Sequence, residues 1–109
     1  MVKFLPRKKL LKFKLDEMII KKPKRWDGKW RVVIFDIPEK FRLGRDYLRN
    51  KLKELGFYQM QKSAWVHPYP CGDEVDFIKE LYEVRPFVRV ITADSIDIKH
   101  DLVKYFNSS

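Results

Sequence analysis

The side chain best suited to chemistry is a single carboxylate, Asp36, which follows a short apolar run. Residues 32–35 are apolar and mostly β-branched, and four residues are too few for a helix, so they predict a strand buried on both faces. Pro38 has no N–H to donate to a β-ladder, so we expect the strand to end near Ile37. A carboxylate at the mouth of such a strand loses hydration unless a metal ion, an arginine or backbone donors pair with it. Asp36 is therefore the first candidate for a functional residue.

The rest of the chain predicts the elements that would position Asp36. The predicted order of elements is β-α-β(β)-α-β. It follows from apolar residues at helical spacing, from the helix end expected at Gly56, and from segments rich in β-forming residues. Two such helices would cover one face of an antiparallel sheet, so we expect an α+β fold, a ferredoxin-like sandwich. The predicted elements are a strand around residues 32–35, a helix over 41–55, strand structure over 57–69, a helix over 73–84 and a strand over 87–93.

Two segments leave alternatives open. Residues 57–70 must form either a tight hairpin or one kinked strand, and no Asn-Gly or Asp-Gly turn marks their middle. We expect any break to fall at Ser63. Residues 94–106 fit either a short helix or an edge strand exchanged between two subunits.

Positive charge is concentrated at the N-terminus. The 109 residues carry a net charge of +9, and residues 1–31 contain 12 Lys or Arg against 3 acidic residues. We therefore divide the chain into a basic arm or linker-like segment, residues 1–25, and a ferredoxin-like domain, residues 26–109. Clustered cations bind phosphate backbones by releasing counterions. The candidates in the arm for nucleic-acid contacts are Arg7, Lys8, Lys9, Lys21, Lys22, Lys24 and Arg25.

Other interpretations of this basic arm are a solvated tail and an amphipathic helix on a membrane surface. Apolar residues at positions 11, 15, 18 and 19 have the spacing of a short helix. Their number indicates that the arm packs on another part of the protein.

Each predicted helix carries a stripe of like charge. In one interpretation the helices lie side by side and the stripes form surface ion pairs, each worth less than about 1 kcal/mol. In the other, Arg42 and Arg45, which are nearest Asp36 in the chain, bind phosphates. The stripes are Arg42, Arg45, Arg49 and Lys53 in the first helix, and Asp73, Asp76, Glu80 and Glu83 in the second.

Composition excludes several classes of protein. A chain of 109 residues with 45% hydrophobic content forms one domain. No apolar run is long enough for a signal peptide or a membrane span, so we expect a cytoplasmic protein. The single Cys71 excludes an intrachain disulfide, and the isolated His67 and His100 have no spacing typical of a zinc site or a catalytic triad.

Motifs around Asp36 resemble those of two known families. FDI at residues 35–37, the basic helix that follows, Gly56 and Q-x-S-x-W-V at residues 61–66 are similar to the small CRISPR-associated dimeric nucleases, the "Cas two" proteins. WDGKWR at residues 26–31 resembles the central domain of PaaX-type transcriptional repressors, which has the same fold. The resemblance implies a ferredoxin-like fold, a homodimer and association with nucleic acid, either duplex DNA or RNA.

The resemblance to the nucleases also implies roles for single residues. In that family the aspartate matching Asp36 from each subunit holds one divalent metal, Mg²⁺ or Mn²⁺, at the dimer interface. A two-fold axis would thus supply the second carboxylate that one chain lacks. The metal would activate water and stabilise charge on the phosphate, which makes Asp36 the catalytic and metal-binding residue of an endonuclease. The family position of Ser63 implies a phosphate contact. The resemblance also implies a second possible role, a non-catalytic DNA bridge for spacer acquisition, with a CRISPR integrase subunit as its partner in antiviral defence.

Departures from both families keep other functions open. Ile-Pro-Glu at residues 37–39 replaces the polar and acidic stretch of the nucleases, and residues 1–25 resemble only the linker that follows a winged-helix domain in the repressors. Asp36 could instead cap the next turn or pair with Arg42 or Arg89. The alternative hypotheses are a free-standing PaaX-like central domain that acts as a non-catalytic dimerisation or regulatory module, and a small toxin-like or ribonuclease-type relative with the same fold.

Overall fold

The computed structural model describes residues 13–107 of the chain. Residues 13–16 are helical and are followed by an extended segment that leads to the sheet. The other elements are β1 (Trp30–Phe35), η1 (Glu39–Phe41), α2 (Arg42–Glu54), β2 (Tyr58–Gln61), β3 (Ala64–His67), α3 (Gly72–Leu81), η2 (Arg85–Phe87), β4 (Val88–Ala93) and α4 (Lys99–Asn107). The predicted order β-α-β-β-α-β is therefore present, and a further helix, α4, follows it.

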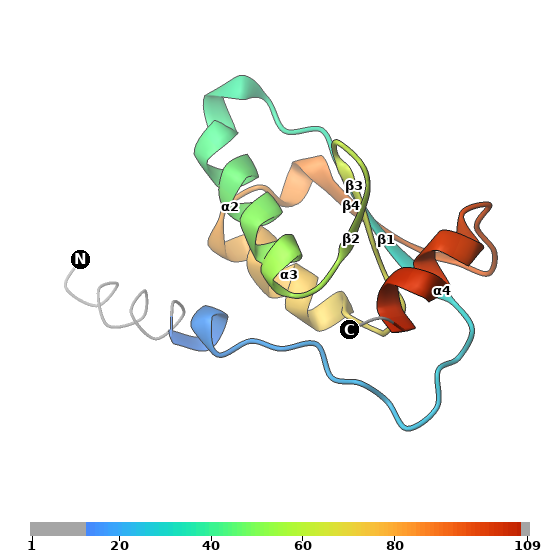
Figure 1. Cartoon of the computed structure of the whole chain (residues 1–109). Coiled ribbons are helices and arrows are strands. Elements are labelled where there is room, and N and C mark those ends of the chain that lie inside the picture. The colour runs from blue at the N-terminus through green and yellow to red at the C-terminus, as the bar shows by residue number, and fades with distance from the viewer. Residues whose placement is uncertain (1–12, 108–109) are drawn as a thin grey trace.

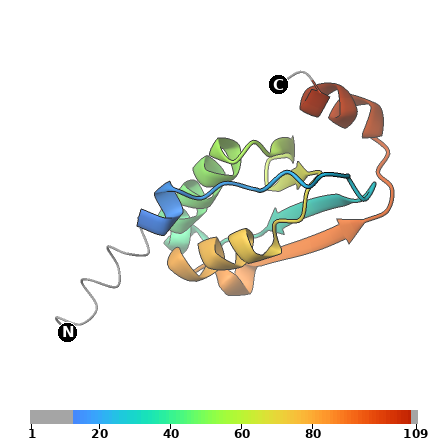
Figure 2. The same ribbon diagram turned by 90° about the horizontal axis from the view of Figure 1, so that it is seen from below.

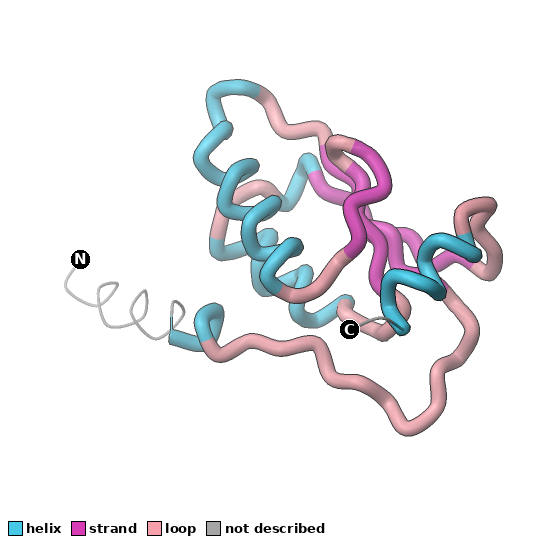
Figure 3. Tube along the Cα trace, in the orientation of Figure 1, coloured by secondary structure: helices cyan, strands magenta, loops and turns pink. Residues whose placement is uncertain are grey.

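The four strands form one antiparallel sheet in the order β2-β3-β1-β4. β1 lies in the interior of the sheet, and β4 lies at one edge. Helices α2 and α3 pack on one face, and α4 packs on the other (Figures 1 and 2). Figure 3 shows the long loop that brings the chain from the N-terminal helical turn to β1. The α+β, ferredoxin-like sandwich predicted from the sequence is confirmed.

Successive residues of β1 face opposite sides of the sheet, so this strand contributes to two hydrophobic cores. Val33 and Phe35 pack with buried residues of α2 and α3. Trp30 and Val32 pack on the other face with Leu102 of α4. Both faces of β1 are covered, which agrees with the continuous apolar run of residues 32–35 from which burial on both faces was predicted.

Residues 57–70 form a hairpin, which decides between the two predicted alternatives. The two-residue turn Lys62–Ser63 joins β2 to β3, and the ladder shifts register between Gln59 and Gln61. Such a shift increases the local twist, which lets strands join without an Asn-Gly turn. At the C-terminal end, residues 99–107 are helical, so the edge-strand alternative for this segment is wrong.

The N-terminal segment packs against the helical layer. Leu15 is buried within the core between the sheet and helices α2 and α3. The buried ammonium of Lys51 on α2 donates to the Leu15 carbonyl oxygen at 2.6 Å and pairs with the Glu54 carboxylate at 3.1 Å. Packing of the arm is thus confirmed at Leu15, whereas Ile19, predicted on the same face, is 75% exposed. Arg7, Lys8, Lys9 and position 11 lie outside the described residues.

Helix α2 approaches the end of α3 closely enough to require glycine at position 44. A Cβ built on Gly44 would lie 2.8 Å from Val84 Cγ1 and 2.9 Å from the Tyr82 carbonyl oxygen. The chain leaves α3 through Glu83, whose φ of 57° lies in the left-handed region that favours glycine. This close contact fixes α2 against the C-terminal end of α3.

Candidate functional site

Asp36 lies directly after β1, at the end of the sheet where β4 begins. Its backbone N–H donates to the Phe87 carbonyl oxygen at 2.9 Å, which ties the residue to the start of β4. Its side chain is exposed, and no residue between 13 and 107 makes a hydrogen bond or ion pair with the carboxylate. Arg42 and Arg89, the two predicted structural partners, bind other groups.

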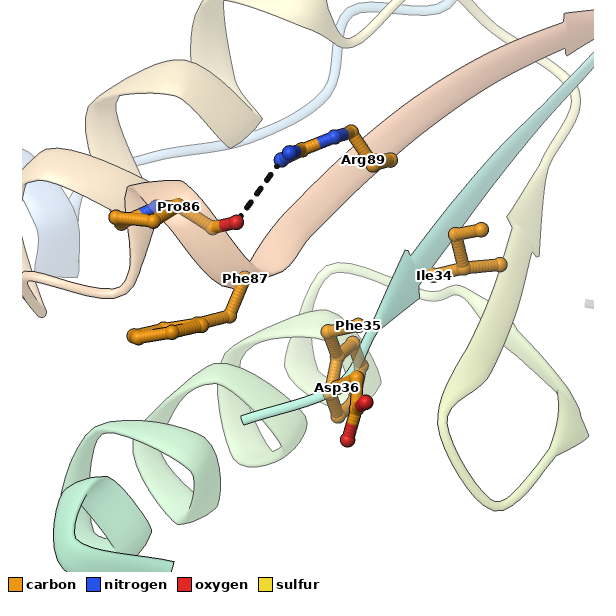
Figure 4. Close-up of a pocket in the computed structure, with 6 residues that line it drawn as sticks. All are labelled: Ile34, Phe35, Asp36, Pro86, Phe87 and Arg89. Atoms are coloured by element: carbon orange, nitrogen blue, oxygen red, sulfur yellow. Dashed lines mark hydrogen bonds between the residues drawn. The ribbon is translucent and has the colours of Figure 1, made fainter. Parts of the chain in front are cut away.

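A depression of about 420 Å³ adjoins Asp36. It is lined by Ile34, Phe35, Asp36, Pro86, Phe87 and Arg89 (Figure 4). The Arg89 guanidinium donates to the carbonyl oxygens of Pro86, at 3.2 Å, and Val88, at 2.9 Å. In Figure 4 the Asp36 carboxylate points away from Arg89, so one depression holds an unpaired acid and an arginine without an acid partner.

The hairpin turn lies at the same end of the sheet. The Ser63 carbonyl oxygen accepts a hydrogen bond from the Phe35 N–H at 3.1 Å, which places Ser63 next to the residue before Asp36. Arg49 of α2 donates to the Lys62 carbonyl oxygen at 3.0 Å. The structure therefore brings Asp36, Ser63 and Arg49 to one end of the domain.

The arginines predicted to grip phosphates, Arg42 and Arg45, both pair with Glu39 in η1. Their guanidinium nitrogens lie 3.8 and 3.3 Å from the Glu39 carboxylate, and Arg45 also lies 3.8 Å from Asp46. On the second helix, Asp76 and Glu80 pair instead with Arg85. The ion pairs are therefore local to each helix and do not join α2 to α3.

The sequence gives little indication that three cations, Arg49, Lys62 and Arg89, lie at the same end of the domain as Asp36. Arg49 belongs to the predicted stripe, but the sequence favours Arg42 and Arg45 as the phosphate contacts within it. The one signal for Lys62 is its place beside Ser63 at the predicted break. The sequence suggested Arg89 only as an ion-pair partner of Asp36, whereas in the structure the two residues line one depression without pairing.

The buried polar groups near the other end of β1 have structural roles. Arg31 makes a two-point contact with Asp27, at 2.9 and 2.5 Å, and donates to the Pro68 carbonyl oxygen at 2.8 Å. Hydrogen bonding to the Arg31 guanidinium lowers the pKa of Asp27 to about 2. Within the same motif, the Trp26 indole N–H donates to the Lys29 carbonyl oxygen. The WDGKWR motif is thus a clamp that holds the loop before β1.

Two further buried groups are kept uncharged. Burial lowers the pKa of His67 to about 4, and its Nδ1 accepts a hydrogen bond from the Tyr69 N–H at 3.1 Å. Burial also raises the pKa of the Cys71 thiol to about 12. Neither group suits nucleophilic or acid–base chemistry, because a nucleophile or base must be accessible and near its working pKa. Asp36 remains the candidate for chemistry.

One copy of the chain offers little to a metal ion. Across residues 13–107 no three His, Cys, Asp or Glu side chains are grouped so that they could hold one. Asp36 alone would contribute a single carboxylate, and Mg²⁺ prefers six oxygen ligands, most of which water can supply. The donor set fits a metal only if a second carboxylate joins Asp36.

The sequence matches a known family over most of its length. A sequence model of the PaaX protein central Cas2-like domain matches residues 23–103. No curated protein and no solved structure matches the chain. Within residues 13–107, every helix is too short or too polar to cross a membrane. Since the match covers well over half of the sequence and includes β1, the hairpin and β4, this chain belongs to the PaaX central Cas2-like domain family.

Proposed function

We propose that the chain is a homodimerisation module that binds the phosphate backbone of duplex nucleic acid without reading its sequence. The observation that carries this proposal is the outer edge of β4. That strand pairs with β1 on one side only, and Val90 and Ile91 are 37% and 45% exposed on its two faces. It has no proline, and Arg89 is its only charged residue.

An edge strand of this kind is a template for pairing with another strand. Monomeric proteins usually block such edges with charges, proline or bulges, and β4 carries one charge in six residues. A second copy meeting the same edge across a two-fold axis would bury Val90 and Ile91 of both copies. The paired sheets would then form one continuous sheet with both Asp36 residues on the same assembly.

The charge of the chain supports nucleic acid as the ligand. Four cations of the arm, at positions 21, 22, 24 and 25, are exposed in the described segment. A dimer would present two such arms, and each cation that neutralises a phosphate releases counterions. Binding of this type depends steeply on salt and little on sequence.

Binding of a labelled DNA duplex, followed by fluorescence anisotropy over a salt series, tests the proposal. The protein is compared with Val90→Gln/Ile91→Gln, which removes the apolar edge without changing charge, and with Leu43→Gln, which alters an exposed apolar residue on α2. We expect the edge variant to have about half the salt slope, because a monomer has half the phosphate contacts. Weak, salt-independent binding by the wild-type protein would overturn the proposal.

A second candidate function is metal-dependent phosphodiester cleavage, favoured by the exposed and unpaired carboxylate of Asp36. In a dimer with a two-fold axis through this site, two Asp36 carboxylates would hold one Mg²⁺ or Mn²⁺, with water as the other ligands. The metal would supply an activated water and offset charge on the phosphate. Asp36 would then act only as a ligand.

Cleavage of single-stranded RNA and duplex DNA with Mg²⁺ or Mn²⁺ separates the two candidates. The comparison is wild type with Asp36→Asn, which keeps the size of the side chain and removes its charge. Metal-dependent activity that disappears in the variant supports cleavage. If a folded dimer binds the duplex but does not cleave it, the chain is a non-catalytic module. If wild type and Asp36→Asn cleave equally well, the activity comes from a site other than Asp36.

A further inference from the structure

The arginines of the folded domain fall into two groups according to their partners. Between residues 26 and 107, four of the six arginines pair with acids: Arg31 with Asp27, Arg42 and Arg45 with Glu39, and Arg85 with Asp76. The other two, Arg49 and Arg89, donate only to backbone carbonyl oxygens. Their positive charge is therefore not offset by an ion pair with any acid in the described part of the chain.

These two arginines lie at the same end of the sheet, together with an exposed lysine. Ile34 of β1 pairs with Ala64 of β3 on one side and with Arg89 of β4 on the other. Ala64 directly follows the turn that holds Lys62, and Arg49 binds the carbonyl oxygen of that lysine. The strand backbones of such a rung span two strand spacings, about 10 Å. Arg89 leaves β4 on the face opposite α2, because its neighbour Val88 packs under α2 and α3, whereas Arg49 reaches the turn from the α2 side.

A duplex crossing this end would place several phosphates within reach. Duplex DNA carries one negative charge per roughly 1.7 Å of its axis, so about six phosphates fall within a span of about 10 Å. The four charged residues placed at this end, Arg49, Lys62, Arg89 and Asp36, carry three positive charges and one negative charge. The net charge of these residues is therefore positive, which favours contact with the phosphates of a duplex.

The hydrogen bonds that Arg49 and Arg89 already make favour this role. A guanidinium has five N–H donors, and bonds to backbone carbonyls leave several of them for a phosphate. The carbonyl also restrains the long side chain, so binding costs less conformational entropy. By contrast, Glu39 would compete with phosphate for both Arg42 and Arg45.

We infer that Arg49, Lys62 and Arg89 form the domain's phosphate-binding surface, and that Arg42 and Arg45 do not belong to it. The inference rests on the proposed binding of duplex nucleic acid, for which it names the contact residues. It replaces the arginine stripe of α2, which the sequence favoured, with a cluster drawn from α2, the hairpin turn and β4.

The test compares two double variants that each remove two arginines. Arg49→Gln/Arg89→Gln alters the group without acid partners, and Arg42→Gln/Arg45→Gln alters the pair held by Glu39 as a matched control. In the salt-series anisotropy assay with a DNA duplex, we expect the first variant to lower the slope of log affinity against log salt by about 4, because the proposed dimer loses four arginines, at roughly 0.9 for each phosphate that is no longer neutralised. We expect the control to lower it by less than about 1.

Lys62→Glu provides a check that does not depend on the hydrogen bond between Arg49 and the turn. This side chain is exposed and makes no hydrogen bond or ion pair within the described residues, so the charge reversal leaves the fold intact. At low salt, Lys62→Glu should weaken duplex binding at least as much as a substitution that only neutralises one phosphate-binding cation. Thermal melting of each variant establishes that it is folded.

Three results would overturn the inference. A larger effect of the Arg42 and Arg45 control than of the Arg49 and Arg89 variant would return the surface to the stripe on α2. Unchanged binding by Lys62→Glu would remove the hairpin turn from the surface. In both cases the proposed function stands. Absence of salt-dependent binding by the wild-type protein would contradict the inference and the proposed function together.

Discussion

The buried imidazole of His67 makes the stability of the domain depend on pH. Its surroundings are the rings of Phe57, Tyr69 and Phe106, at 4.9 to 5.6 Å between centroids. Burial lowers its pKa from 6.5 to about 4. Because the folded-state pKa is depressed, the unfolded chain binds the proton more readily, and stability falls as the pH falls from 6.5 towards 4.

The size of this effect follows from the shift in pKa. One pKa unit corresponds to about 1.4 kcal/mol, so a shift from 6.5 to about 4 gives on the order of 3 kcal/mol over the whole window. Most of that, roughly 2.5 kcal/mol, disappears between about pH 7.5 and about pH 4.5. Asp27, whose pKa is about 2, loses its contribution only as the pH falls below its unfolded value of 3.8, so its window is separate.

Urea unfolding at several pH values between these limits measures the effect. In His67→Asn, the amide oxygen can still accept the hydrogen bond from the Tyr69 N–H, but no proton is taken up. This variant should be less stable at neutral pH, and its stability should change much less between about pH 7.5 and about pH 4.5 than that of the wild type. His100→Asn, at an exposed position, is the matched control. An undiminished pH dependence in His67→Asn would show that a different group is responsible.

Three further predictions concern other single groups. Gly44→Ala should destabilise the domain by about 1 to 3 kcal/mol in urea unfolding, because the added methyl would overlap Val84 and the Tyr82 carbonyl oxygen; an unchanged midpoint would contradict the close contact. Glu83→Gly should raise the melting temperature, gaining up to about 1 kcal/mol by relieving the left-handed conformation, and a fall would show that the glutamate contributes something else. Cys71 should resist a thiol reagent in the native protein and react on unfolding, and rapid native labelling would contradict its burial.

Local patterns were enough to predict most of the fold. The apolar run of β1 indicated burial on both faces, and Gly56 marked the end of the first predicted helix, so the order of elements followed. Local patterns could not settle the C-terminal segment. Its apolar residues pack on the face of the sheet opposite α2 and α3. The residues that they contact there belong to distant strands, so the sequence around residues 94–106 does not reveal this packing.

The candidate site was only partly predictable. The family resemblance implied roles for both Asp36 and Ser63, and the structure brings the two residues to the same end of the sheet. The pairing of Arg42 and Arg45 with an acid could not be predicted, because their partner Glu39 lies in a short helix that the sequence did not predict. The hydrogen bond between Lys51 and the Leu15 carbonyl oxygen joins residues 36 positions apart, and no local pattern signals it.

Pairing of two copies through β4 underlies the proposed function, and the mass of the protein in solution tests it. Sedimentation equilibrium over a range of concentrations should give twice the monomer mass for the wild type and for Leu43→Gln. Val90→Gln/Ile91→Gln, which changes only the exposed apolar edge, should give the monomer mass. A wild-type protein that remains monomeric at all concentrations, or an edge variant that still dimerises, would contradict pairing through this strand.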